Sequence, residues 1–139
     1  MNPQRWIGLL SVIALVSVMA PAGLTDKAWA FETKSNSSGM VTVQVTPKQL
    51  APGQAARFQI SMSTHSVDLD QDLTAVSTLT DDQGGTYQPE KWAGSPPGGH
   101  HRAGELIFPA LKADVQSIKL VISNVAGVPE RVYHWDMNK

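Results

Sequence analysis

The chain has 139 residues, a formal net charge of −1 at pH 7 and no cysteine. Its length suits one small domain rather than two, and the lack of cysteine excludes a disulfide framework. The nearly balanced charge, with no basic stripe interleaved with aromatic residues, argues against nucleic-acid binding.

Residues 1–30 have the parts of an export signal. Arg5 supplies a basic start, residues 6–20 are apolar, and the segment Ala28-Trp29-Ala30 places small residues at both positions of an A-x-A cleavage site. The apolar run is short for a membrane-spanning helix, which needs about 20 residues. We therefore expect cleavage after Ala30, a periplasmic or extracellular location, and no membrane insertion after cleavage. An uncleaved N-terminal anchor is the alternative.

The polar segment 31–39 predicts a flexible leader, and residues 40–139 predict one folded domain. From residue 41 onward, apolar and polar residues alternate in short runs separated by glycine and proline, which is typical of half-buried strands. The expected strands are residues 41–46, 58–63, 75–79, 86–92, 105–108, 117–123 and 131–137.

About seven strands in roughly 100 residues are typical of an antiparallel immunoglobulin-like β-sandwich. A small barrel is the main structural alternative. No amphipathic helix of useful length is expected, and residues 111–115 could form at most one turn. The Cys…Trp…Cys pattern of antibody domains is missing, so the expected resemblance concerns architecture alone.

A histidine pair lies in a loop rich in glycine and proline, residues 92–104, at the segment Gly98-Gly99-His100-His101-Arg102. Imidazole is the best nitrogen ligand for a transition metal in a chain without cysteine. Because side chains alternate along a strand, we expect one histidine of the pair to face the core or a pocket and the other to face solvent. The functional interpretation is a metal or ligand loop. The structural one is a loop whose histidines satisfy buried carbonyl groups.

Three aspartates, Asp68, Asp70 and Asp72, have the spacing of the first ligands of a calcium-binding loop. The rest of that motif fails, because Leu73 stands where the loop needs glycine and Leu79 where it needs glutamate. We expect instead a strand with an acidic face toward solvent and an apolar face toward the core.

The two remaining histidines have different settings. His65 follows an apolar strand, at a rim position where it could meet the histidine pair. His134 lies among aromatic residues of the last strand, a setting more typical of a packed residue than of a metal ligand. Met40, Met62 and Met137 add thioethers, which suit Cu(I). The pattern around Met62 predicts a core position, whereas Met40 and Met137 lie at strand ends.

Enzyme signatures are missing from the sequence. It has no cysteine nucleophile, no Gly-x-Ser-x-Gly elbow, no His-Glu-x-x-His helix and no phosphate-binding glycine loop. We therefore expect a protein that is not an enzyme.

Two motifs, THSVDL at residues 64–69 and GGHHRxG at residues 98–104, together with Trp92-x-Gly94, carry a resemblance. They resemble a family of small exported bacterial domains with an immunoglobulin-like or cupredoxin-like sandwich and no secure activity. The resemblance extends from about residue 40 to residue 135 and implies the fold and export. The chain lacks the cysteine of a blue-copper site, which argues against electron transfer.

The sequence as a whole predicts an exported, non-enzymatic domain that binds a transition metal, copper or zinc with copper favoured, through His65 with His100 or His101. His134 and a methionine are optional further ligands. The alternative is a metal-free interaction or structural module of the cell envelope, in which Trp92 and the Gly-Pro loop contact a protein partner.

Overall fold

The computed structural model of the chain describes residues 31–138. The expected export signal, residues 1–30, lies outside this range. No helix among the described residues combines the length and apolar character that crossing a membrane requires.

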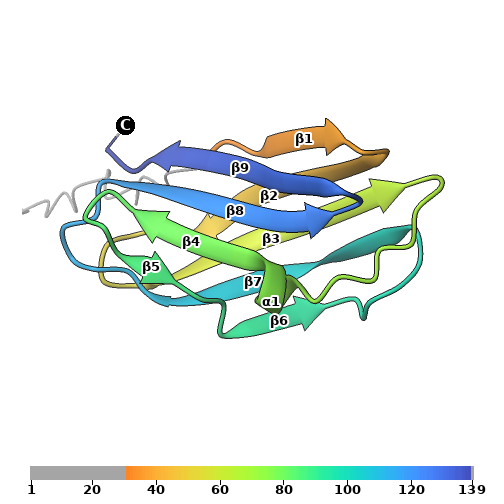
Figure 1. Cartoon of the computed structure of the whole chain (residues 1–139). Helices are drawn as coiled ribbons and strands as arrows, with labels where there is room; N and C mark the ends of the chain where they lie inside the picture. The colour runs from red at the N-terminus through yellow and green to blue at the C-terminus, as the bar shows by residue number, and fades with distance from the viewer. Residues whose placement is uncertain (1–30, 139) are drawn as a thin grey trace, which may run out of the picture.

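Two antiparallel sheets face each other (Figure 1). The five-stranded sheet consists, in spatial order, of β1 (Lys34–Ser38), β2 (Val41–Gln49), β3 (Ala55–Thr64), β7 (His101–Ala110) and β6 (Lys91–Gly94). The four-stranded sheet consists of β5 (Thr86–Tyr87), β4 (Ser77–Asp81), β8 (Ser117–Val125) and β9 (Val128–Asp136). A short helix, α1 (Leu73–Val76), leads into β4.

The order of the strands is that of an immunoglobulin-like sandwich. The set β2-β3-β7-β6 follows the A-B-E-D order of such domains, and β5-β4-β8-β9 follows the order C′-C-F-G. The chain crosses between the sheets after β3, β5 and β7. The expected antiparallel β-sandwich is therefore confirmed, with β1 added as an outer strand by a hairpin with β2.

Alternating side chains fill the space between the sheets, as the sequence pattern predicts. Phe58, Ile60 and Met62 of β3 are buried, and the residues between them point outward. The ring of Phe58 packs edge-on against Phe108 at 5.7 Å and lies 5.5 Å from Trp135 of the opposite sheet. The aromatic contacts join the two sheets in one core.

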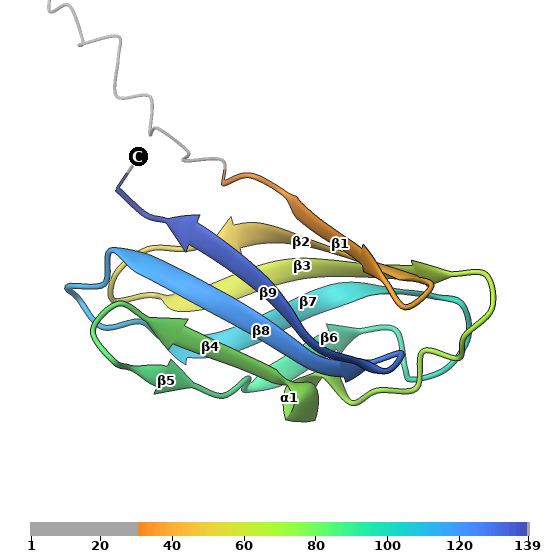
Figure 2. The same ribbon diagram turned by 45° about the horizontal axis from the view of Figure 1, so that its top comes forward.

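The expectation of a flexible leader at residues 31–39 is wrong for residues 34–38. These residues form β1, which pairs with β2 along its whole length, and the carbonyl oxygen of Glu32 accepts a hydrogen bond of 2.8 Å from Trp135 Nε1. β1 lies beside β9 at the edge of the sandwich (Figure 2). A polar segment can form an edge strand because main-chain pairing there needs no apolar face.

Within residues 31–138 the number of strands is nine rather than the expected seven, because β1 is added and one expected strand is divided in two. A third difference changes only a strand boundary. The expected strand at residues 75–79 starts later, because Asp72 Oδ1 caps α1 by accepting a hydrogen bond from Thr74 N. The expected strand at residues 86–92 is divided at Pro89 into β5 and β6, which belong to different sheets.

Arg131 of β9 is fully buried and holds several segments together. Its guanidinium donates hydrogen bonds to the side-chain and main-chain oxygens of Asn36 and to the main-chain oxygens of Ser38, Val41 and Val125, at 2.8 to 3.3 Å. Burial lowers the pKa of Arg131, and the charge of a neighbouring tyrosine partly offsets this effect. Arginine stays charged in proteins, so these are charge-assisted hydrogen bonds.

Replacement of Arg131 by methionine should lower the free energy of unfolding by about 3 kcal/mol or more, because buried main-chain oxygens lose their donors while the volume is nearly kept. Denaturant unfolding followed by circular dichroism measures the loss. The matched control is Arg57→Met, since the Arg57 side chain is 44% exposed and pairs with Glu105. The control should change stability by about 1 kcal/mol or less. An equal loss in both variants would contradict the proposed role of the Arg131 hydrogen bonds.

Candidate functional site

The candidate site lies where β2 starts, β3 ends and β7 starts, at one end of the five-stranded sheet (Figure 1). In the register of the sheet, Val41 faces Thr64, and Ser63 faces His101. Thr64 N also donates a hydrogen bond of 3.0 Å to His100 O. His65, which follows Thr64, is therefore next to the strand end that carries the histidine pair.

The expected division of the pair between core and solvent is wrong, because both His100 and His101 are exposed. β7 begins at His101, whose side chain points outward like that of its partner Ser63. The next residue, Arg102, takes the inward position. His100 lies before the strand, in a bend that follows Gly99 with its φ of +76°.

Hydrogen bonds fix the loop before His100 against the loop that follows His65. Leu69 N donates to Gly99 O at 3.0 Å, and Gly98 N donates to Leu69 O at 2.8 Å. The carboxylate of Asp68 accepts a hydrogen bond of 2.8 Å from Gly99 N. The two loops therefore act as one unit, although about thirty residues of chain separate them.

Arg102 supports both loops from inside. Its Nη1 atom donates to Gln71 O at 2.6 Å and to Leu69 O at 3.3 Å, and Nη2 donates to Ser95 O at 3.4 Å. Burial lowers the pKa of Arg102, and the nearby carboxylates of Asp72 and Asp70 partly offset this effect. The buried position of Arg102 is not among the expectations from the sequence. The signal was present, because strand alternation from an outward His101 turns Arg102 inward.

Thr64 connects the loop of His65 to the start of β2. Its hydroxyl donates a hydrogen bond of 2.8 Å to Met40 O and accepts hydrogen bonds of 3.3 Å from Ser66 N and Val67 N. The hydroxyl of Ser66 lies 3.4 Å from Met40 Sδ. The Met40 thioether therefore lies at the same end of the sheet as His65.

The aspartates behave as expected in their exposure but not in their secondary structure. Asp68, Asp70 and Asp72 are exposed while Leu69 and Leu73 are buried. The segment is an irregular loop followed by α1 rather than a strand. Hydrogen bonds from the hydroxyl and amide of Thr74 lower the pKa of Asp72, as expected for a helix cap.

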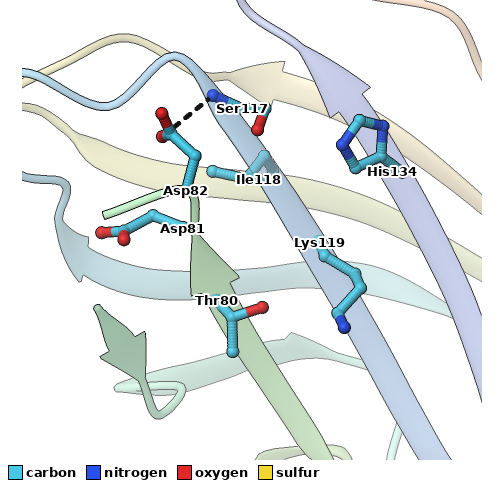
Figure 3. Close-up of a pocket in the computed structure, with 7 residues that line it drawn as sticks. All are labelled: Thr80, Asp81, Asp82, Ser117, Ile118, Lys119 and His134. Atoms are coloured by element: carbon cyan, nitrogen blue, oxygen red, sulfur yellow. Dashed lines mark hydrogen bonds between the residues drawn. The ribbon is translucent and has the colours of Figure 1, made fainter. Parts of the chain in front are cut away.

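His134 lies on the other sheet, away from this end. It faces Lys119 in the register of β8 and β9 and lines an open hollow together with Asp81 and Asp82 (Figure 3). Figure 3 shows the two carboxylates across β8 from His134. Hydrogen bonds from the amides of Gln116 and Ser117 hold the pKa of Asp82 below its ordinary value, so this carboxylate fixes the turn before β8.

Trp92, the aromatic residue of the alternative interaction surface, is engaged within the fold. Its Nε1 atom donates a hydrogen bond of 2.8 Å to Ser95 O, and the Arg102 guanidinium lies 5.7 Å from the centre of its ring. The side chain is partly buried against the core.

Within residues 31–138, no three side chains of the His, Cys, Asp or Glu types gather closely enough to hold a metal ion. The four histidines therefore do not form one centre. His65, His100 and His101 share one end of the sandwich, and His134 is separate from them.

The chain matches no protein-family model, no curated protein and no solved structure. The chemistry of the site must therefore be derived from its own residues.

Substitution of Thr64 by valine should loosen the loop that carries His65, because Ser66 N and Val67 N lose their acceptor. We expect their amide hydrogens to exchange roughly tenfold faster, equivalent to a net loss of about 1 kcal/mol. Hydrogen exchange resolved by NMR measures this change. The control Thr86→Val alters an exposed position of β5 in the other sheet and should leave both amides unchanged. Unaltered exchange in Thr64→Val would show that the hydroxyl does not hold the loop.

Proposed function

We propose that this chain is an exported, non-enzymatic domain that binds a transition metal, copper rather than zinc, through His65 and His101. The observation that carries the proposal is the placement of two exposed imidazoles on adjacent strand ends of one sheet. His100 is next to them and serves as an alternative ligand.

The register supports a shared ion. The pairing of β3 with β7 ends at Ser63 and His101, and Thr64 N donates to His100 O just beyond it. The chain turns after Thr64, whose hydroxyl accepts hydrogen bonds from Ser66 N and Val67 N, so His65 lies in this turn beside the start of β7. Gly99 has no side chain, and the space that a side chain would take there is open. Two imidazoles can then bind one ion at metal–nitrogen distances of about 2.0–2.1 Å.

The fixed backbone supports metal binding as well. The loops of His65 and His100 are joined by main-chain hydrogen bonds and held from inside by Arg102. Ligands on a preorganised backbone lose less conformational entropy when they bind an ion. Copper is favoured because divalent copper binds nitrogen ligands more tightly than the other first-row metals do.

The metal-free alternative has less support. It relies on Trp92 as a contact residue, but the indole N–H and one face of the ring already have partners in the fold. We therefore treat an interaction or structural module of the envelope as the outcome that remains when no metal binds.

Removal of both imidazoles, in the variant His65→Ala/His101→Ala, should abolish stoichiometric copper binding, because His100 is then the last imidazole at this end of the sheet. Each single variant should weaken binding by at least about tenfold. The full chain is expressed, and titration calorimetry of the purified protein with Cu(II) and Zn(II) gives the affinities.

The control for this titration is His134→Ala, which removes an exposed imidazole from the other sheet and should leave binding unchanged. Circular dichroism of every variant establishes that the fold is kept. Copper binding that survives the double change would overturn the site, and a wild-type protein that binds no metal would overturn the proposed function.

Export with cleavage after Ala30 belongs to the same proposal. The start of the fold supports it, because Phe31 packs against the core and the carbonyl oxygen of Glu32 accepts the hydrogen bond from Trp135. Residues 31 and 32, directly after the expected cleavage site, are thus part of the folded domain. We propose a periplasmic or extracellular location on this basis.

Expression of the full chain in a secreting bacterium should yield a protein whose intact mass corresponds to residues 31–139. Ala30→Arg should block processing, because the cleavage site needs a small residue there, whereas Trp29→Ala should be processed normally. Mass spectrometry of the envelope fractions measures both. A wild-type product that keeps residues 1–30 in the membrane fraction would favour the uncleaved anchor.

A further inference from the structure

We infer that the thioether of Met40 is a third ligand of the proposed metal site and that it makes the site selective for Cu(I). This inference rests on the proposed function and adds to it the oxidation state of the ion. It is carried by the hydrogen bonds around Met40, by the exposure of its side chain and by the chemistry of the donors.

Hydrogen bonds place Met40 beside the turn that carries His65. The pairing of β2 with β3 ends at Val41 and Thr64, and beyond it Thr64 Oγ1 donates a hydrogen bond to Met40 O. Thr64 and Val41 are buried, whereas Met40 and His65 are exposed. The contact of 3.4 Å between Met40 Sδ and Ser66 Oγ places the sulfur beside the loop of His65.

Met40 has no role in the core, because 72% of the residue is exposed. Its backbone has a φ of +65°, and the preceding Gly39 has a φ of +58°. A side chain in this left-handed region costs on the order of 1–2 kcal/mol relative to the right-handed one. The two residues form the turn of the β1–β2 hairpin, which needs positive φ at both positions. The conformation thus has a structural cause, and it is the exposure of the thioether that fits a ligand-binding role.

The sulfur and the imidazole are attached to one rigid piece of backbone. Thr64 Oγ1 donates its hydrogen bond to Met40 O and accepts those of the two residues after His65. The Met40 main chain is held further by Arg131, which binds the carbonyl oxygens of Ser38 and Val41 on either side of it. The main chain that carries these two donors is therefore held in place by hydrogen bonds.

The donor set matches monovalent copper. Thioethers are soft ligands and select Cu(I), whereas zinc takes imidazole, thiolate and carboxylate. Two imidazoles and a thioether carry no charge, so they offer a divalent ion no neutralising anion. The carboxylate of Asp68, on the loop that follows His65, accepts a hydrogen bond from Gly99 N.

The test compares Met40→Leu with the wild-type protein. Leucine keeps the apolar volume and removes the sulfur. Purified protein from expression of the full chain is titrated without oxygen against Cu(I) held in a bicinchoninate buffer, and Cu(II) and Zn(II) are titrated separately. X-ray absorption of the Cu(I)-loaded protein reports whether sulfur is bound to copper. Met137→Leu, at the opposite end of β9 from the β8–β9 turn, is the matched control.

We expect a copper–sulfur signal in the wild-type protein and in Met137→Leu, and its loss in Met40→Leu. The Cu(I) affinity of Met40→Leu should fall by at least about tenfold, with little change for Zn(II). Copper binding through nitrogen alone, or a sulfur signal that persists in Met40→Leu, would overturn this inference while the proposed function stands. A wild-type protein that binds neither copper nor zinc would overturn both.

Discussion

The arrangement of the strands at the end of the sandwich where β2 starts depends on the hydrogen bonds of the Arg131 guanidinium. This guanidinium binds carbonyl oxygens from β1, from the start of β2 and from the end of β8. Among residues 31–138 the ion pair is Arg57–Glu105, so neither Arg131 nor Arg102 has a carboxylate bound to it. Apart from Asn36 Oδ1, their acceptors are main-chain oxygens, which a side-chain substitution leaves in place. A buried apolar residue in either position would remove a donor from each of these oxygens, although Leu69 O would keep Gly98 N and Ser95 O would keep Trp92 Nε1.

The two buried arginines also link the core to the proposed site. Arg131 binds the carbonyl oxygens of Ser38 and Val41, which flank Met40. Arg102 follows His101 directly and binds Leu69 O, on the loop that pairs with Gly98 and Gly99. Met40 and His101 therefore each lie next to a residue that is buried or is bound by a buried arginine. Loops held in this way can keep exposed side chains in fixed positions at little entropic cost.

Sequence alternation predicts the core of this protein well, because burial of Phe58, Ile60 and Met62 follows from period two alone. It does not predict β1, whose polar side chains give no apolar signal and whose stability comes from pairing with β2 and from Arg131. Nor does it place charged residues in the core, since arginine is almost never fully buried unless paired. The expectation that one histidine of the pair faces inward is wrong for this reason. The inward residue of the segment is Arg102, and both histidines are exposed.

The inward arginine also bears on the charge around the proposed site. Arg102 places a buried positive charge one residue from His101, and the carboxylates of Asp70 and Asp72 act on it without a direct ion pair. Together with Asp68, three exposed carboxylates lie on the loop that this one guanidinium binds. Coulomb attraction scales with the charge of the incoming ion, so these charges give no advantage to a monovalent ion over a divalent one. A preference of the proposed site for Cu(I) would therefore have to come from the donor atoms, and among them from the soft sulfur of Met40.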